Sequence, residues 1–523
     1  MTSESYDYVV VGAGSAGCAA AGRLAELSGA RVALVEAGPP AKGRLFEIPT
    51  LFSQQLKSAF DWDYHSEPEP LLGGRRAYLP RGRAVGGTSS MNTMVYIRGN
   101  RFDYDKWRDL GNEGWGYEEV LPFFKRSEDN ERGADSFHGV GGPLTVSDAR
   151  SVHPLLEAWI EAAVEAGHRR NEDFNGAEQE GVGRFQMTQR DGLRCSSAVA
   201  FLAPAGDNLT VLPSTLALRI RWDGVRAVAL EVDHLGEVRE IGIEGELIVS
   251  SGAYNSPHLL LQSGVGDPEQ LRAAGIAPLH SVPAVGRNLR DHVGCFLSFL
   301  SDTQPMLGPD TSAEEERLRR DGDGPMAWTE VGGFMKTSDA IEVPDIQMHA
   351  ALGIVRDEGL AAPLDHGVGF GPYVARSTSL GAVTIRHPHP YAKPRIVHNY
   401  LSDPEERRIL RDGLRMAIEI ARQPVLAQHL KTDLKSSAEL GLAPREESDA
   451  AIDEFIRANA FSFYHPSGTC AMGEVVDAKL RVDGLANVRV ADTSIMPTEP
   501  TGNLNAPAIM IGERVAAFVK DAA

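Results

Sequence analysis

Apolar and small residues near the N-terminus follow a strand–helix–strand order. Residues 7–12, Asp-Tyr-Val-Val-Val-Gly, form a short β-branched run that predicts a buried parallel strand. Residues 18–26 have the composition of a helix, and residues 31–35, Arg-Val-Ala-Leu-Val, predict a second strand. Because parallel strands are joined by a crossover, usually a helix, this order predicts a β-α-β unit and an α/β fold.

The same pattern predicts several later elements. Residues 404–422 read as an amphipathic helix, with apolar side chains at i,i+4 spacing. A strand is expected over 210–220 and a helix over 506–519, whereas the charged segment 313–322 is expected to be a loop. No internal repeat or low-complexity segment is visible along the chain.

The turn between the first strand and the helix carries three glycines in G-x-G-x-x-G spacing. Gly12 permits the tight turn, Gly14 lets a pyrophosphate approach the backbone, and Gly17 lets helix and strand pack closely. The helix N-terminus offers free N–H groups to the phosphates, and Glu36 ends the second strand where it can accept from ribose hydroxyls. A purely structural turn is the alternative. The acid at position 36 argues against NADP, and the motif does not separate NAD from FAD.

Composition narrows the class of protein. The 523 residues include 72 Asp and Glu against 52 Lys and Arg, a formal net charge of −20, so nucleic-acid binding is not expected. Cys18, Cys195, Cys295 and Cys470 are too far apart for a C-x-x-C zinc pair and too few for a disulfide framework, and no metal site is expected. The N-terminus shows no cationic segment, and no apolar stretch reaches the roughly 20 residues that span a bilayer. We therefore expect a cytoplasmic protein without an integral membrane span.

A second glycine-rich segment, residues 79–107, contains the stretch GGTSSMN at 86–92. An ordinary surface loop is the alternative, but the apolar residues 94–97 indicate that this loop is packed down. With this segment the chain resembles the glucose–methanol–choline (GMC) family of flavin oxidoreductases. Five further segments resemble motifs of that family in the same order: 252–266 (GAYNSPHLLLQSGVG), 284–292 (AVGRNLRDH), 464–473 (YHPSGTCAMG), 488–497 (VRVADTSIMP) and 502–516 (GNLNAPAIMIGERVA).

The resemblance implies FAD as cofactor and a fold in which a Rossmann-like FAD-binding domain is interleaved with a substrate domain built on an antiparallel sheet with helices. Met91 stands where some members carry the histidine that tethers FAD, so non-covalent FAD is expected. The expected domains are 1–145, 190–298 and 462–523 for FAD, and 146–189 and 299–461 for substrate. The expected FAD-binding residues are Gly12, Gly14, Ser15, Ala16, Gly17, Glu36, Ala37, Val85, Gly87, Asn92, Met94, Val95, Ala217, Ala491, Asp492 and Asn503.

His465 is the strongest candidate for an acid/base group. Pro466 follows it and a Ser-Gly-Thr turn comes next, so the histidine is held at the end of an element, which suits a positioned base. From the residues alone a structural role stays open. The resemblance implies that His465 is the family's catalytic histidine and that Asn503 is its partner. For Asn503 and Asn505 the alternative role is to cap the following helix.

The sequence says less about the other histidines and about the identity of the substrate. His138, His258 and His292 are expected to be structural, although the last two lie in family motifs. Glu330 beside Trp328 would suit a quaternary ammonium group by charge and cation–π contact, yet choline is not favoured. Aryl, furanic, sugar and aliphatic alcohols all stay open as the small-molecule substrate.

The mechanism implied by the resemblance is oxidation of a primary or secondary alcohol. His465 takes the hydroxyl proton while the α-carbon passes hydride to flavin N5, and the reduced flavin is reoxidised by O2 or another acceptor. An FAD-containing hydroxynitrile lyase of the same fold is the alternative. A light-driven fatty-acid decarboxylase is disfavoured by the pair His465 and Asn503, and a flavoprotein without enzymatic activity is a further reading.

Overall fold

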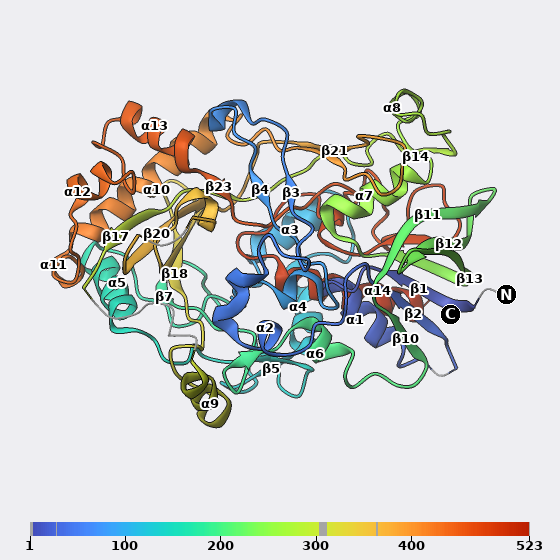
Figure 1. Cartoon of the computed structure of the whole chain (residues 1–523), viewed down its shortest axis with the longest axis horizontal. Helices are drawn as coiled ribbons and strands as arrows, with labels where there is room; N and C mark the ends of the chain where they lie inside the picture. The colour runs from blue at the N-terminus through green and yellow to red at the C-terminus, as the bar shows by residue number, and fades with distance from the viewer. Residues whose placement is uncertain (1–3, 28, 303–310, 362–363, 522–523) are drawn as a thin grey trace.

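Two seven-stranded sheets lie toward opposite ends of the molecule (Figure 1). The computed structural model describes residues 4–27, 29–302, 311–361 and 364–521. The N-terminal β-α-β unit is present as predicted, with β1 at Ser5–Val11, α1 at Ser15–Leu24 and β2 at Val32–Val35. All four residues of β2 are buried, as expected for a strand of a parallel sheet covered on both faces.

The first sheet has the strand order β10-β2-β1-β13-β12-β11, with β24 beside β13. One part of this sheet is parallel and consists of β10, β2, β1, β13 and β24. Beyond β13 the sheet continues as an antiparallel meander of β12 and β11. The later strands are β10 (Leu209–Leu212), β11 (Thr215–Asp223), β12 (Arg226–His234), β13 (Glu237–Val249) and β24 (Val488–Val490).

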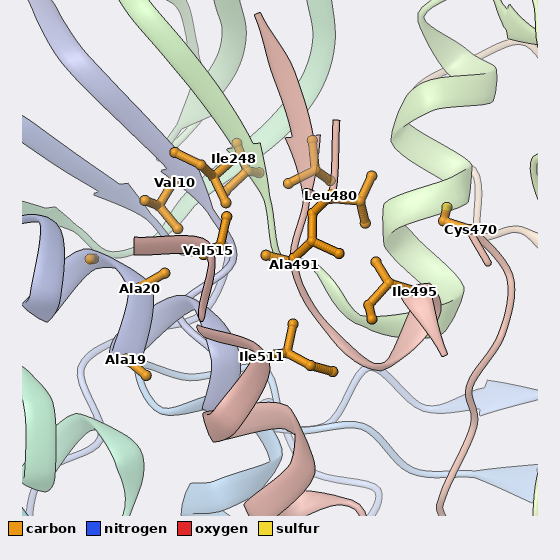
Figure 2. Packing of buried hydrophobic residues seen from close by; sticks show 14 of the residues in the cluster. Val10, Ala19, Ala20, Ile248, Cys470, Leu480, Ala491, Ile495, Ile511 and Val515 are labelled. Atoms are coloured by element: carbon orange, nitrogen blue, oxygen red, sulfur yellow. The ribbon is translucent and has the colours of Figure 1, made fainter. Parts of the chain in front are cut away.

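The last helix, α14 (Asn505–Lys520), packs against α1 beside this sheet. Figure 2 shows the apolar cluster between them, where Val10 and Ile248 of the sheet meet Val515 of α14. The helices approach closely because a Cβ at Gly512 would lie 2.2 Å from the carbonyl oxygen of Ala16. The first and last elements of the chain therefore share one core.

The second sheet has the order β23-β16-β20-β19-β18-β7, with β17 beside β20, and its pairings are antiparallel. Helix α10 (Pro404–Arg422) packs on β20 and has the bounds that its periodicity predicted. The strands are β7 (Gly181–Arg184), β16 (Val293–Gly294), β17 (Leu297–Leu300), β18 (Val331–Met335), β19 (Ile346–Leu352), β20 (Gly367–Val374) and β23 (Phe461–Ser462). Further helices at this end are α5 (Pro154–Glu165), α11 (Pro424–Ala427), α12 (Leu434–Glu439) and α13 (Asp449–Asn459).

The α/β fold class with an antiparallel second sheet is confirmed. The finer division of the chain into domains stays a prediction. The strands β16 and β17 pair in the second sheet and begin at Val293, a few residues before the expected boundary at 298. No helix in the described part of the chain is both long and apolar enough to cross a membrane.

Two expectations are wrong. The single strand expected over 210–220 is two strands, because Pro213 and Ser214 turn the chain and Ser214 adopts φ +51°. The charged segment expected to be a loop forms α9 (Ser312–Asp321) instead. Thr311 caps this helix by accepting from the backbone N–H of Glu314, and Glu315 pairs with Arg319 one turn later. The pattern of apolar residues does not predict α9, because Leu318 is the only residue of this helix that is buried.

Candidate active site

A cavity of about 650 Å³ connects the glycine turn of the first sheet to side chains of the second sheet. At one end, here called the cofactor end, its wall includes Gly14 and Glu36. At the other, the catalytic end, it includes Trp328, His465 and Asn503. The cavity therefore joins the two groups of residues that the sequence singled out.

Gly14 is unusual among the glycines that the structure describes. Each of the others either has a positive φ or would bring a Cβ within 4 Å of other atoms. At Gly14 the φ is −78° and a Cβ would meet no atom within 4 Å. Neither backbone strain nor crowding within the chain requires a glycine there, so the space in front of it is room for a ligand.

The other two glycines of the motif act within the protein. Gly12 has φ +100°, and a Cβ there would lie 2.5 Å from the carbonyl oxygen of Ser250. A Cβ at Gly17 would lie 1.9 Å from the carbonyl oxygen of Gly12. Gly17 is absent from the cavity wall, and its role is the close approach of helix to strand.

Glu36 is held rigidly at the cofactor end. Its carboxylate accepts from the backbone N–H of Ala13 at 2.9 Å and from that of Gly38 at 2.8 Å. The side chain is buried, and burial raises the pKa of this carboxyl to about 7 despite those two hydrogen bonds. The geometry suits an acceptor for sugar hydroxyls.

Two helix N-termini open onto the cavity. Ser15 and Ala16 of α1 line it, and no side chain caps that helix. Asn505 begins α14, but its side-chain oxygen accepts from the hydroxyl of Ser15 at 2.7 Å, and α14 also has no side-chain cap. The alternative role, in which Asn503 or Asn505 caps the helix, is therefore wrong, and both helix ends keep free N–H groups for an anionic ligand.

The structure places most of the expected FAD-binding residues on the cavity wall. Ala491 is not among them, because it lies in the apolar cluster of Figure 2, and Val85 is buried in the same core. The residues on the wall are Gly12, Gly14, Ser15, Ala16, Glu36, Ala37, Gly87, Asn92, Met94, Val95, Ala217, Asp492 and Asn503. Met91 also lines the cavity, and its thioether offers no nitrogen for a covalent link.

The segment that carries His465 is fixed by several hydrogen bonds. Its backbone N–H donates to Asp291, whose carboxylate also accepts from Ser462 and Tyr400, both at 2.5 Å. The preceding residue, Tyr464, adopts φ +68°, a left-handed conformation that costs free energy in a residue other than glycine. Such a conformation persists only where its surroundings hold it, and here they hold His465 against the cavity.

His465 and Asn503 lie side by side. Nδ2 of Asn503 is 3.2 Å from Nε2 of His465. Burial holds the pKa of His465 well below its usual range, and the neighbouring His292 and His349 add to this effect. The imidazole is therefore neutral near pH 7, which is the form that accepts a proton.

Sequence reasoning missed the polar groups that support this pair. Gln347 donates from Nε2 to Oδ1 of Asn503 at 3.1 Å, and Tyr373 donates to Oε1 of Gln347. Nε2 of His349 lies 2.9 Å from Nε2 of Gln347, and its Nδ1 lies 2.7 Å from Oε2 of Glu330. Gln347 and His349 stand two residues apart in the buried strand β19, and that alternation of polar residues was the available signal.

The walls of the catalytic end are largely aromatic and aliphatic. They include Phe52, Trp62, Phe296, Trp328, Leu352, Ile354, Val355, Phe461, Phe463 and Tyr464. Both carboxylates on this part of the wall already have partners. Glu330 accepts from Nε1 of Trp328 at 2.8 Å, and Glu358 accepts from the backbone N–H of Tyr78 and pairs with Arg75.

Comparisons with known proteins agree with this geometry. Two family models described as GMC oxidoreductase match residues 6–294 and 377–512. The mitochondrial choline dehydrogenase of Mus musculus is 39% identical over 544 residues, which cover 99% of this chain and 90% of that protein. The oxygen-dependent choline dehydrogenase of Brucella anthropi is 38% identical over 97% of this chain and 94% of its own length.

Solved structures are also similar. The pyridoxine 4-oxidase from Mesorbium loti superposes with a TM-score of 0.89 at 32% identity, covering 98% of each chain. A formate oxidase superposes with a TM-score of 0.90 at 22% identity over 100% of this chain and 99% of its own, which supports the fold alone.

Proposed function

Because the chain belongs to the GMC oxidoreductase family, we propose that it oxidises an uncharged alcohol with an aromatic or aliphatic body, using His465 as base and Asn503 as partner. FAD is its cofactor, and oxidation of CH–OH groups is its reaction. The observation that carries the proposal is the 3.2 Å contact between Nε2 of His465 and Nδ2 of Asn503 on the wall of one continuous cavity.

The residues of the cofactor end fit FAD. Gly14 leaves room for a pyrophosphate beside the free N-terminus of α1, and Glu36 suits the ribose hydroxyls. Met91 supports a non-covalent association. When bound, FAD supplies the acceptor for the hydride equivalent that leaves the substrate carbon.

The catalytic residues act on the alcohol oxygen. Nδ2 of Asn503 lies 3.2 Å from Nε2 of His465, and a substrate hydroxyl that contacts both replaces this bond: it donates to the lone pair of Nε2, and its oxygen accepts from Nδ2. The neutral imidazole of His465 accepts the hydroxyl proton as the oxygen gains negative charge, and Asn503 holds that oxygen without competing for the proton. The apolar walls keep water away from this step.

The wall of the catalytic end favours a neutral substrate body. Glu358 is paired with Arg75, and both oxygens of Glu330 are held, one by Nε1 of Trp328 and the other by Nδ1 of His349, so neither of these carboxylates stands without a partner. Choline is the second candidate, because relatives named choline dehydrogenase are up to 39% identical and the aromatic walls suit a cation–π contact. The cytoplasmic location stays a prediction.

An anaerobic titration tests the proposal. The flavin absorbance of the purified holoenzyme is followed while benzyl alcohol, pyridoxine, 1-hexanol or choline is added. Bleaching by the neutral alcohols supports the proposal, and admitting air afterwards tells whether O2 is the acceptor. Bleaching by choline alone would replace the substrate class, and a flavin that no alcohol reduces would contradict the proposed reaction.

A further inference from the structure

His292 lies directly behind His465, on the side away from the cavity. It precedes β16 (Val293–Gly294), is completely buried, and is absent from the cavity wall. Its Nδ1 is 3.0 Å from Nδ1 of His465, and the two rings are perpendicular. The ring of His292 also stacks on Tyr373, with centroids 4.6 Å apart. His292 therefore touches the base but has no access to a substrate.

The far nitrogen of His292 faces acceptors. Its Nε2 is 3.0 Å from the backbone carbonyl oxygen of Ala375, a group that only accepts hydrogen bonds. Oε2 of Glu499 lies 3.3 Å from the same nitrogen. Burial lowers the pKa of His292 to about 3 and raises that of Glu499 well above its usual range, so both partners are neutral rather than an ion pair. The Ala375 carbonyl can only accept, and neither oxygen of Glu499 has a hydrogen-bond partner among the described residues, so Nε2 of His292 carries the proton that meets the carbonyl.

The position of the proton on His292 determines which nitrogen of His465 carries the lone pair. A neutral imidazole protonated at Nε2 has a lone pair at Nδ1, so Nδ1 of His292 accepts. Nδ1 of His465, 3.0 Å away, must then donate, which leaves a lone pair on Nε2 of His465. That lone pair points at the N–H group of Asn503 on the cavity wall.

The hydrogen bonds of Asn503 lead independently to the same tautomer of His465. Tyr373 donates to Oε1 of Gln347, so the amide nitrogen of Gln347 faces Asn503 and donates to its Oδ1. Asn503 must then present its Nδ2 to His465, whose Nε2 can only accept. From Gln347 through Asn503, His465 and His292 to Ala375, every hydrogen bond points in one direction.

We propose that His292 is a positioning residue, which holds His465 in the Nδ1–H tautomer so that its Nε2 is the base. The inference rests on the proposed function, because it concerns the same base. Once Nε2 has taken the substrate proton, Nδ1–H of the cationic ring still has an acceptor in His292. The chain thus orients the base before the reaction and keeps it hydrogen-bonded afterwards.

The test compares three variants of the holoenzyme. His292→Leu removes the acceptor and is expected to slow anaerobic flavin reduction about 100-fold while FAD stays bound. His292→Asn places a carbonyl oxygen near the position of Nδ1 and is expected to restore most of the rate. His366→Leu is the matched control, because it makes the same change at an exposed histidine that is absent from the cavity wall, and it is expected to change the rate less than about threefold.

Two further readouts separate positioning from general structural damage. In a His465→Ala background, His292→Leu is expected to cause no additional loss of rate. In the wild type, the ¹⁵N chemical shifts of labelled histidine are expected to show an unprotonated Nε2 and a protonated Nδ1 for His465, assigned with the His465→Ala variant. This second readout needs no folded His292→Leu protein.

The outcomes that overturn the inference are distinct from failure of the proposed function. A protonated Nε2 on His465 in the wild type, or an equal loss from His292→Leu with and without His465, would overturn it. Unchanged reduction in His465→Ala would instead remove the proposed base itself. Slow reduction in His465→Ala combined with a normal rate in His292→Leu would leave the base and remove only the role of His292.

Discussion

The two ends of the cavity present different parts of the protein to a ligand. The cofactor end is mostly backbone: an open glycine at Gly14, two uncapped helix N-termini, and one carboxylate, Glu36, held by backbone N–H groups. The catalytic end is built from side chains: His465 and Asn503 of the C-terminal segments meet Gln347 of the second sheet. A site formed by backbone groups should tolerate most side-chain substitutions, except those that fill the space for the ligand. A site formed by side chains should lose function when any one of its hydrogen-bonding residues is replaced.

Removing the proposed base, His465, should produce the largest effect, at the catalytic end alone. His465→Ala is expected to slow anaerobic reduction of the flavin by about 10²–10⁴-fold, because no other group replaces the proton acceptor. FAD should stay bound, since its expected contacts lie mainly at the other end. Stopped-flow absorbance measures the rate, and the flavin-to-protein absorbance ratio measures retention.

The exposed histidine variant His366→Ala is the control for His465→Ala and should reduce at the wild-type rate. Loss of FAD from His465→Ala would show that the two ends are coupled, which would break the contrast between them.

Filling the space at Gly14 should have the next largest effect and act at the cofactor end. Gly14→Val is expected to weaken FAD binding by about 100-fold or more, because a side chain would occupy the space where the pyrophosphate approaches. Its φ of −78° suits any residue, so the unfolding free energy of the apoprotein should fall by only about 1 kcal/mol or less.

Fluorescence of free FAD on titration with apoprotein measures the affinity, and thermal unfolding measures the stability. Gly14→Ala provides a graded comparison, with a smaller loss of affinity than Gly14→Val. Equal affinity in all three proteins would show that no ligand passes close to Gly14.

The same contrast explains what the sequence predicted and what it missed. The β-α-β unit and its glycines are local in sequence, so spacing alone indicated them, and α10 followed from its periodicity. Gln347 and His349 were missed because their partners come from distant segments, and only the folded chain brings them together. His292 was expected to be structural, since nothing in the sequence places it against His465.

The smallest expected effect concerns Glu36, and it tests the contrast between the two ends of the cavity through the pH dependence of FAD binding. The pKa of this carboxyl is about 7 without ligand, chiefly because burial disfavours its charge. Ribose hydroxyls donate to the ionised form, so FAD binding favours the carboxylate and releases a proton when the site is protonated. Affinity for FAD is therefore expected to rise with pH up to about 7 and then level off, and to fall by at most about tenfold for each unit below it.

Titrations of apoprotein with FAD at pH 6, 7 and 8 measure this dependence. Glu36→Gln is nearly isosteric and does not titrate, so it should bind FAD more weakly and lose the pH dependence in this range. If wild type and variant showed the same slope, a different group would titrate on binding. If neither showed a slope, Glu36 would already be ionised in the free protein, and the cofactor end would rely on its backbone N–H groups alone.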